Sequence, residues 1–295
     1  NFENLEVKWV WRSDNFGPNL DYFARSTPIY VDGMLYTVAT PRRQVVAIDP
    51  ETGETLWVFR EPETVRHLRS PRQAYGKGVA YGEVDGRGVI YVTSPAFFLW
   101  ALDAKTGLPL ENWGTSVPLD GFSDTGVNDL IPPLVSDWGR WQDRAGSYDA
   151  GYGIPRELGM VTASAPPIVV NGVVVVLVGH QPSYGQTRIE NVPGDIMGFD
   201  AATGEFLWKF HVIPRPGEFG HETWYNDAWQ WSGDMSSWAP ASADPELGLV
   251  YIVTNASTVQ FYAGHRPGDN LFGGSVLALD VQTGERKWHF KIHRS

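Results

Sequence analysis

The chain contains no cysteine among its 295 residues. This absence excludes disulfide frameworks, cysteine metal sites and thiol catalysis, although it does not identify a compartment. No apolar run approaches the roughly 18 residues that a membrane-spanning helix needs. The longest run, at 173–178, is rich in β-branched residues and predicts a short buried strand. The first residues do not have the pattern of a signal peptide.

An excess of basic residues is also missing. The chain has 23 Lys and Arg against 34 Asp and Glu, which gives a formal net charge of −11 at pH 7. Nucleic-acid binding depends on a basic surface, so we predict that the chain does not bind nucleic acid. Charged residues make up only 19% of the chain and hydrophobic residues 42%. This balance favours a globular protein with a sizeable core over a disordered or coiled-coil chain.

One short pattern, Asp-x-x-Thr-Gly, occurs four times and is the strongest internal signal. In each copy we expect the Asp and Thr side chains to bond the amides of a tight turn, while Gly takes a positive φ. The strand after the turn ends in a tryptophan, which we expect to pack on the neighbouring sheet. The turns begin at Asp49, Asp103, Asp200 and Asp280, and the tryptophans are Trp57, Trp113, Trp208 and Trp288.

A second hairpin precedes several of these repeats. Asp-Gly and Asn-Gly pairs between apolar runs at 27–36 and 167–174 are typical of two-residue hairpin turns. Two hairpins make a four-stranded blade, and repeated blades make an all-β fold, the β-propeller. We therefore predict a single β-propeller domain over 1–295 with about four blades.

The spacing of the repeats exceeds a minimal blade of about 40–50 residues. Long loops are therefore predicted between blades, chiefly at about 114–160 and 209–235. We expect them to be packed and to carry functional residues. Since the spacing suits a ring of more blades and the chain stops without terminal structure, we expect it to be the N-terminal half of a longer propeller.

The repeat resembles the tryptophan-docking repeat of the pyrroloquinoline quinone (PQQ)-dependent dehydrogenases. These are eight-bladed propellers that hold the quinone and Ca²⁺ near the central axis. The similarity covers essentially the whole chain and is most specific at 219–224, 236–238, 244–255 and 266–270. The resemblance implies a periplasmic enzyme that oxidises an alcohol or an aldose sugar. It also implies that electrons pass to an acceptor such as cytochrome c or ubiquinone. The resemblance does not distinguish Ca²⁺ from a lanthanide as the metal ion.

The resemblance also assigns candidate site residues. Trp238 matches the tryptophan that forms the floor under the quinone, and Ser236 stands where the family often has a Thr that bonds the quinone. Asn255 matches an amide ligand of the metal, and Glu190 is the candidate carboxylate ligand. Three of them have an ordinary alternative: Trp238 as a blade-packing Trp, Asn255 as a strand-end Asn and Glu190 as a surface carboxylate.

Several positions depart from the family pattern. Lys77 stands where many members have an Arg, with Arg69 and Arg72 nearby. A cation there suits the carboxylates of the quinone, although Lys lacks the bidentate fork of Arg. Arg25 stands where many members have a Glu. The paired Cys of the methanol-oxidising branch is missing, which favours sugars or larger alcohols as substrates.

The resemblance places the catalytic Asp beyond Ser295, so we expect this chain alone to be catalytically incomplete. A non-catalytic propeller, similar to outer-membrane assembly scaffolds, is the alternative.

The aromatic residues of the first long loop either shape a substrate mouth or pack the loop onto the blades. The histidines show no metal-ligand spacing, and we interpret them as ordinary polar residues. The aromatics are Trp138, Trp141, Tyr148 and Tyr152, and the histidines are His180, His211, His221, His289 and His293.

Overall fold

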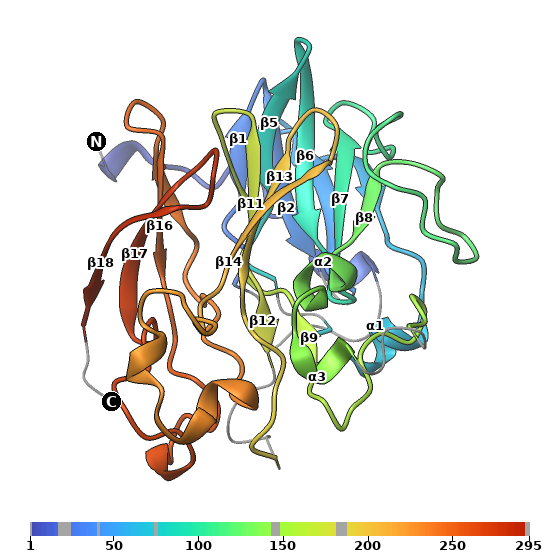
Figure 1. Ribbon diagram of the computed structural model, residues 1–295. Helices are drawn as coiled ribbons and strands as arrows, with labels where there is room; N and C mark the ends of the chain where they lie inside the picture. Colours follow the sequence, from blue (N-terminus) through green and yellow to red (C-terminus); the bar gives the residue numbers. More distant parts are fainter. Residues whose placement is uncertain are drawn as a thin grey trace.

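The computed structural model describes residues 2–16, 25–39, 42–73, 76–142, 148–180 and 188–292. His293 lies outside them. Four antiparallel sheets of four strands each stand side by side as blades (Figure 1). Blade 1 contains β1 (Ile29–Val31), β2 (Met34–Ala39), β3 (Gln44–Ile48) and β4 (Thr55–Phe59). Blade 2 contains β5 (Ala80–Val84), β6 (Arg87–Thr93), β7 (Phe98–Asp103) and β8 (Val127–Asp129). Blade 3 contains β10 (Ile168–Val170), β11 (Val173–Val176), β13 (Ile196–Asp200) and β14 (Phe206–Phe210). Blade 4 contains β15 (Ser242–Asp244), β16 (Leu249–Val253), β17 (Ser275–Asp280) and β18 (Arg286–Lys291).

The remaining elements are short, and α1, α2, α3, β9 and β12 lie toward the lower end of the blades in Figure 1. A two-stranded sheet pairs β9 (Val161–Thr162) with β12 (Gly179–His180). The helices are α1 (Val65–Arg69), α2 (Ile131–Val135) and α3 (Gly139–Gln142), and single 3₁₀ turns include His221–Thr223 and Tyr225–Gln230 in the second long loop. None of the helices in the described ranges is long and apolar enough to cross a membrane.

The predicted hairpins form for the expected local reason. Asp32 and Gly33 both have positive φ, 49° and 79°, between β1 and β2. Asn171 and Gly172 do the same between β10 and β11, with φ of 47° and 77°. Two successive positive φ values give the turn that matches the twist of paired strands. The Asp-Gly and Asn-Gly predictions are confirmed.

The repeat tryptophans join each blade to the next. Trp57 Nε1 donates to Ala104 O at 3.0 Å, across to the Asp-x-x-Thr-Gly turn of blade 2. A Cβ on Gly107, the glycine of that turn, would lie 2.4 Å from Trp57 Cε3, so only glycine leaves room for the indole. The expected packing on the neighbouring blade is therefore confirmed for Trp57, Trp113 and Trp208, whereas Trp288 is 43% exposed and docks on no blade within the described ranges. The same bond is made by Trp9 to Pro50 O at 3.0 Å, Trp113 to Ala201 O at 2.9 Å and Trp208 to Val281 O at 2.8 Å.

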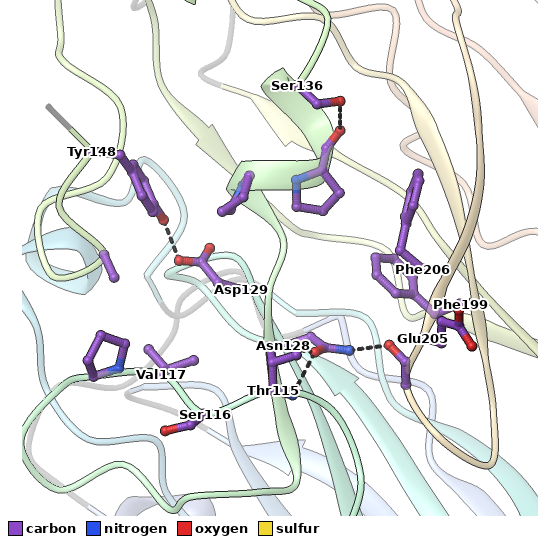
Figure 2. Close-up of a pocket in the computed structure, with 15 residues that line it drawn as sticks. Thr115, Ser116, Val117, Asn128, Asp129, Ser136, Tyr148, Phe199, Glu205 and Phe206 are labelled. Carbon is purple, nitrogen blue, oxygen red and sulfur yellow. Dashed lines mark hydrogen bonds between the residues drawn. The ribbon is translucent and has the colours of Figure 1, made fainter. Parts of the chain in front are cut away.

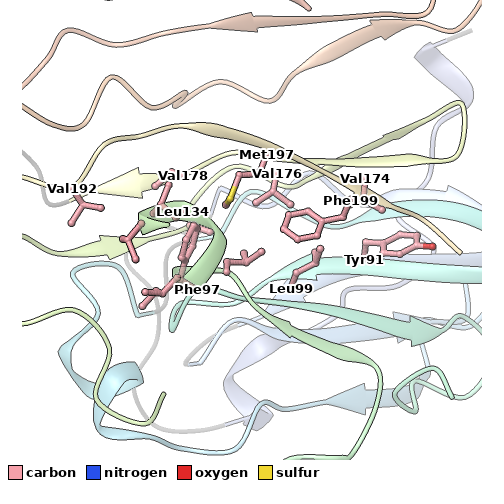
Figure 3. Close-up of a cluster of buried hydrophobic side chains, with 14 of the residues drawn as sticks. Tyr91, Phe97, Leu99, Leu134, Val174, Val176, Val178, Val192, Met197 and Phe199 are labelled. Atoms are coloured by element: carbon pink, nitrogen blue, oxygen red, sulfur yellow. The ribbon is translucent and has the colours of Figure 1, made fainter. Parts of the chain in front are cut away.

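The first long loop packs onto the core between blades 2 and 3. All four valines of β11 are buried, because neighbouring blades cover both faces of the strand. Figure 3 shows Leu134, from the loop, against Phe97 and Val178. Trp138 and Trp141 join the same cluster, so they pack the loop onto the blades rather than line a substrate mouth.

The outer strand of blade 2 is displaced along the chain. Trp113 ends its repeat as expected, but the residues before it do not form the fourth strand of the blade. That strand is β8, which pairs with β7 and begins after Gly126. Gly114 turns with φ of 72°, and a Cβ there would lie 2.3 Å from Val127 O. The loop therefore leaves the blade at Gly114 and returns as β8, and this close passage requires glycine.

Candidate functional site

Trp238 presents an exposed indole beside two cations. Its side chain is 43% exposed, whereas most other tryptophans are partly or fully buried. Arg72 Cζ lies 5.0 Å and Lys77 Nζ 5.7 Å from the ring centroid. Burial lowers the pKa of Lys77, and the charges of Arg72 and Arg25 lower it further. The structure thus brings together Trp238 and Lys77, which were predicted from sequence, and adds Arg72.

Ser236 lies just before Trp238 and is held by a buried carboxylate. The Ser236 hydroxyl donates to Asp234 Oδ1 at 2.8 Å, and Gln260 Nε2 donates to Oδ2 at 3.2 Å. His180 Nδ1 lies 3.2 Å from Oδ1. Burial raises the pKa of Asp234, but the charge of nearby His180 and the hydrogen bonds from Ser236 outweigh burial and lower it. Asp234 is therefore a buried anion at the edge of the site.

Asn255 is fixed beside Ser236 by its backbone. Its N–H donates to Ser236 O at 2.9 Å, and its carbonyl accepts from Gly274 at 3.2 Å. No hydrogen bond to its side-chain amide is found within the described ranges. The amide oxygen is therefore available to a cation, as the predicted role requires.

Two predicted site residues lie in other contacts. Glu190 Oε1 pairs with Arg140 Nη2 of α3 at 3.4 Å, and its side chain is 31% exposed. Arg69 donates to Tyr152 O at 3.0 Å and stacks 3.8 Å from the centroid of the Tyr152 ring. Neither residue makes a described contact with Trp238 or Asn255. The structure therefore does not bring Glu190 together with Asn255, or Arg69 together with Trp238.

The positions of these residues show whether the site suits the quinone and the metal ion that the resemblance implies. A flat indole face with two adjacent cations suits a flat ring that carries carboxylates, so the quinone fits. A hard cation needs several oxygen ligands. Of the two predicted ligands only Asn255 lies at the site, so the described residues provide one part of a metal site.

A second polar cluster ties the two long loops together, away from Trp238. His211 donates from Nε2 to Asp137 Oδ2 and from Nδ1 to Glu218 Oε1, both at 2.7 Å. Lys209 Nζ pairs with Asp137 Oδ1 at 2.7 Å. Burial opposes protonation of His211, but the bonds to the two carboxylates and the charge of buried Asp195 raise its pKa to about 9.

Asp137, Asp195 and His211 have ligand atoms within 4.8 Å of one another, as a metal site would require. Both ring nitrogens of His211 are already bonded to carboxylates, and Lys209 neutralises Asp137. The cluster therefore acts as an internal ion network that clamps the loops.

A cavity of about 690 Å³ lies between the outer strands of blades 2 and 3 (Figure 2). Phe206 and Glu205 lie on one side, and Tyr148 and Asp129 on the other. The Tyr148 hydroxyl bonds Asp129, and Arg66 Nη1 pairs with Asp129 Oδ1 at 2.8 Å. None of the predicted quinone or metal residues lines this cavity, so it is separate from the Trp238 surface, although Tyr148, one of the loop aromatics noted in the sequence, does line it.

Sequence reasoning missed three members of the Trp238 site. Arg72 was noted only as a neighbour of Lys77, His180 was interpreted as an ordinary polar residue, and Asp234 was not singled out. No motif marks them. The available signal was their position, since Arg72 is close to Lys77 and Asp234 is close to Trp238 along the chain.

Comparison with known families gives one match over the whole chain. Residues 1–295 match the model described as PQQ glucose/ethanol/alcohol dehydrogenase, beta-propeller domain. The chain is 31% identical to the glycerol dehydrogenase large subunit of Gluconobacter oxydans, with 100% of this chain and 36% of that protein covered. It is 30% identical to quinohemoprotein alcohol dehydrogenase ADH-IIG of Pseudomonas putida, with 99% of this chain and 35% of that protein covered.

The fold comparison agrees. The solved structure of quinohemoprotein alcohol dehydrogenase ADHIIG from Pseudomonas putida superposes with a TM-score of 0.66 and 27% identity, over 94% of this chain and 35% of that one. The chain therefore spans about a third of the length of these relatives.

Proposed function

The chain belongs to the PQQ glucose/ethanol/alcohol dehydrogenase β-propeller family, and from this premise we propose that it forms four blades of an eight-bladed quinoprotein dehydrogenase. The proposed reaction is the two-electron oxidation of an alcohol or an aldose sugar in the periplasm. Cytochrome c or ubiquinone is the proposed electron acceptor, and the proposed cofactors are PQQ with Ca²⁺ or a lanthanide. The observation that carries the proposal is the exposed Trp238 indole beside Arg72 and Lys77.

Each residue of the site has a role that follows from its contacts. Trp238 would support the flat face of the quinone, and the two cations would bind its carboxylates. Arg72 would be the second cation, since Arg69 is engaged with Tyr152. The Ser236 hydroxyl already donates to Asp234, so toward the quinone it can only accept a hydrogen bond.

The metal part of the site rests on Asn255 and Glu190. Asn255 would give its amide oxygen, while Glu190 would have to leave Arg140 to reach a shared metal ion. When bound, the quinone supplies the electron acceptor, and the metal ion polarises its carbonyl. The base that takes the substrate proton is predicted to lie beyond Ser295.

The test is a titration of the full-length protein with PQQ, with and without Ca²⁺, followed by absorbance. Dye reduction with a panel of alcohols and aldoses then reports turnover. Metal-dependent binding with turnover would support the proposal. Absence of PQQ binding would refute it and favour the alternative, a non-catalytic scaffold.

Two substitutions localise the binding. Trp238→Ala is expected to weaken PQQ binding by at least about a hundredfold, as loss of an aromatic anchor does. Lys77→Ala should weaken it less, because Arg72 remains. Phe261→Ala and Lys287→Ala, both on exposed side chains of blade 4, are the matched controls. Binding that is unchanged in Trp238→Ala would show that the quinone lies elsewhere.

A further inference from the structure

His180 has a buried ring that makes no aligned hydrogen bond to any residue in the described ranges. It ends β12 and is 1% exposed. Within the described ranges, neither Nδ1 nor Nε2 makes an aligned hydrogen bond. Native proteins leave few buried polar atoms unpaired, and an unpaired one points to an ion, a water molecule or a ligand.

One of the two nitrogens already faces a carboxylate. His180 Nδ1 lies 3.2 Å from Asp234 Oδ1, and the side chains are 0% and 7% exposed. This distance is that of an ion pair, although the ring N–H is not aligned for a hydrogen bond. A carboxylate at one imidazole nitrogen fixes the ring and leaves the other nitrogen for a ligand. Nε2 is therefore the atom that needs a partner.

Both neighbours of His180 belong to the Trp238 site. Arg72 Nε donates to His180 O at 3.0 Å, and the Arg72 guanidinium lies over the Trp238 ring. Asp234 in turn accepts a hydrogen bond from the hydroxyl of Ser236, which lies two residues before Trp238 in the chain. His180 is thus tied through its backbone to Arg72 and through its ring to Asp234, and both of these residues contact the parts of the chain that form the proposed quinone surface.

We infer that His180 is a further contact of the quinone, as an imidazolium that pairs with Asp234 through Nδ1 and donates a hydrogen bond from Nε2 to a quinone oxygen. The inference rests on the proposed function, since it names an additional residue of the same site. A carboxylated quinone offers carboxylate and carbonyl oxygens as acceptors. A donor at this position adds to Arg72 and Lys77 and fixes the rotation of the ring on the indole.

Substitutions of His180 in the full-length protein can distinguish the role of Nδ1 from that of Nε2. The amide nitrogen of Asn occupies the position of Nδ1, and that of Gln can reach the position of Nε2. His180→Asn therefore keeps a donor for Asp234 and loses the quinone contact, whereas His180→Gln keeps a donor toward the quinone. His265→Asn, an exposed histidine of blade 4, is the control. The readouts are the dissociation constant of PQQ, the visible absorption of the bound quinone and the melting temperature of the apoprotein.

His180→Asn is expected to weaken PQQ binding about tenfold to a hundredfold, the range of a charge-assisted hydrogen bond, and to shift the absorption of the bound quinone. His180→Gln should bind more tightly than His180→Asn. Weak binding by both variants at wild-type melting temperature would also support the contact, because it would show that the imidazole itself is needed.

Other results would overturn the inference. Wild-type binding and absorption in both variants would make His180 an ordinary core residue. A loss of binding that follows a loss of melting temperature would assign it a structural role. If the wild type itself does not bind PQQ, the proposed function fails and the inference fails with it. Weak binding confined to the variants leaves the proposed function intact.

Discussion

The His211 clamp predicts a pH-dependent stability with a definite sign. The folded pKa is about 9 and the ordinary value is 6.5. Below pH 6.5 the ring is protonated in both states and its full stabilising effect is present. As pH rises from 6.5 through 9, the unfolded chain binds fewer protons than the folded one, so this stability is lost. The side chain is only 16% exposed, so solvent screening is modest.

The size of the effect follows from the same pKa. At ~1.4 kcal/mol for each pKa unit, the rise corresponds to at most about 3 kcal/mol of unfolding free energy. His211→Gln removes the charge while keeping one hydrogen bond to a carboxylate. The variant should therefore be less stable than wild type at pH 6, and the difference should shrink above pH 9.

Urea unfolding of the full-length protein at pH values from 6 to 10 measures this difference directly. His265→Gln, which replaces an exposed histidine, is the control and should show no pH-dependent difference. A gap between wild type and His211→Gln that stays constant from pH 6 to pH 10 would refute the clamp. A gap that widens with pH would show that the charge has the wrong sign.

Three further predictions concern stability. Gly107→Ala and Gly33→Ala both strain a positive φ, but only Gly107 lies against an indole, so Gly107→Ala should lower the unfolding free energy by a further ~1–3 kcal/mol; equal unfolding free energies would show that Trp57 adapts. Arg66→Ala should lower the unfolding free energy by about 3–5 kcal/mol, because the largely buried carboxylate of Asp129 then keeps the Tyr148 hydroxyl but loses its cationic partner, and Arg66→Ala combined with Asp129→Asn should recover part of the loss. Burial raises the pKa of Glu61 from 4.5 to about 7, so stability should fall as pH rises between these values. Glu61→Gln keeps an acceptor for Trp100 Nε1 and should flatten that fall, which urea unfolding of the full-length protein from about pH 4 to pH 8 would detect.

The blades could be predicted because their information is local. Asp49 accepts from the amides of Glu51 and Thr52, and the three later repeats use the same bonds. Such turns depend on side chains only a few residues away, so a sequence pattern contains all of their chemistry. The tryptophan contacts are not local, but the repetition of the pattern made them predictable.

The site was predicted only in part, because its contacts join distant segments. Trp238 and Lys77 were found through the resemblance, and the structure brings them together. The bond between Glu190 and Arg140 depends on how the first long loop packs against blade 3, which no pattern shows. Asp234 was missed for a similar reason. It has a φ of 61°, and this backbone conformation allows its side chain to reach both Ser236 and His180.

The tryptophan contacts give the row of blades a polarity. Each blade offers an indole on one side and a glycine turn on the other, so the contact is head to tail and joins unlike surfaces. Trp9 already fills the turn of blade 1, whereas Trp288 of blade 4 is 43% exposed and has no docking turn within the described ranges. A contact of this kind can be repeated in one direction only, and the rotation at each step decides whether the row closes into a ring or continues as an open spiral.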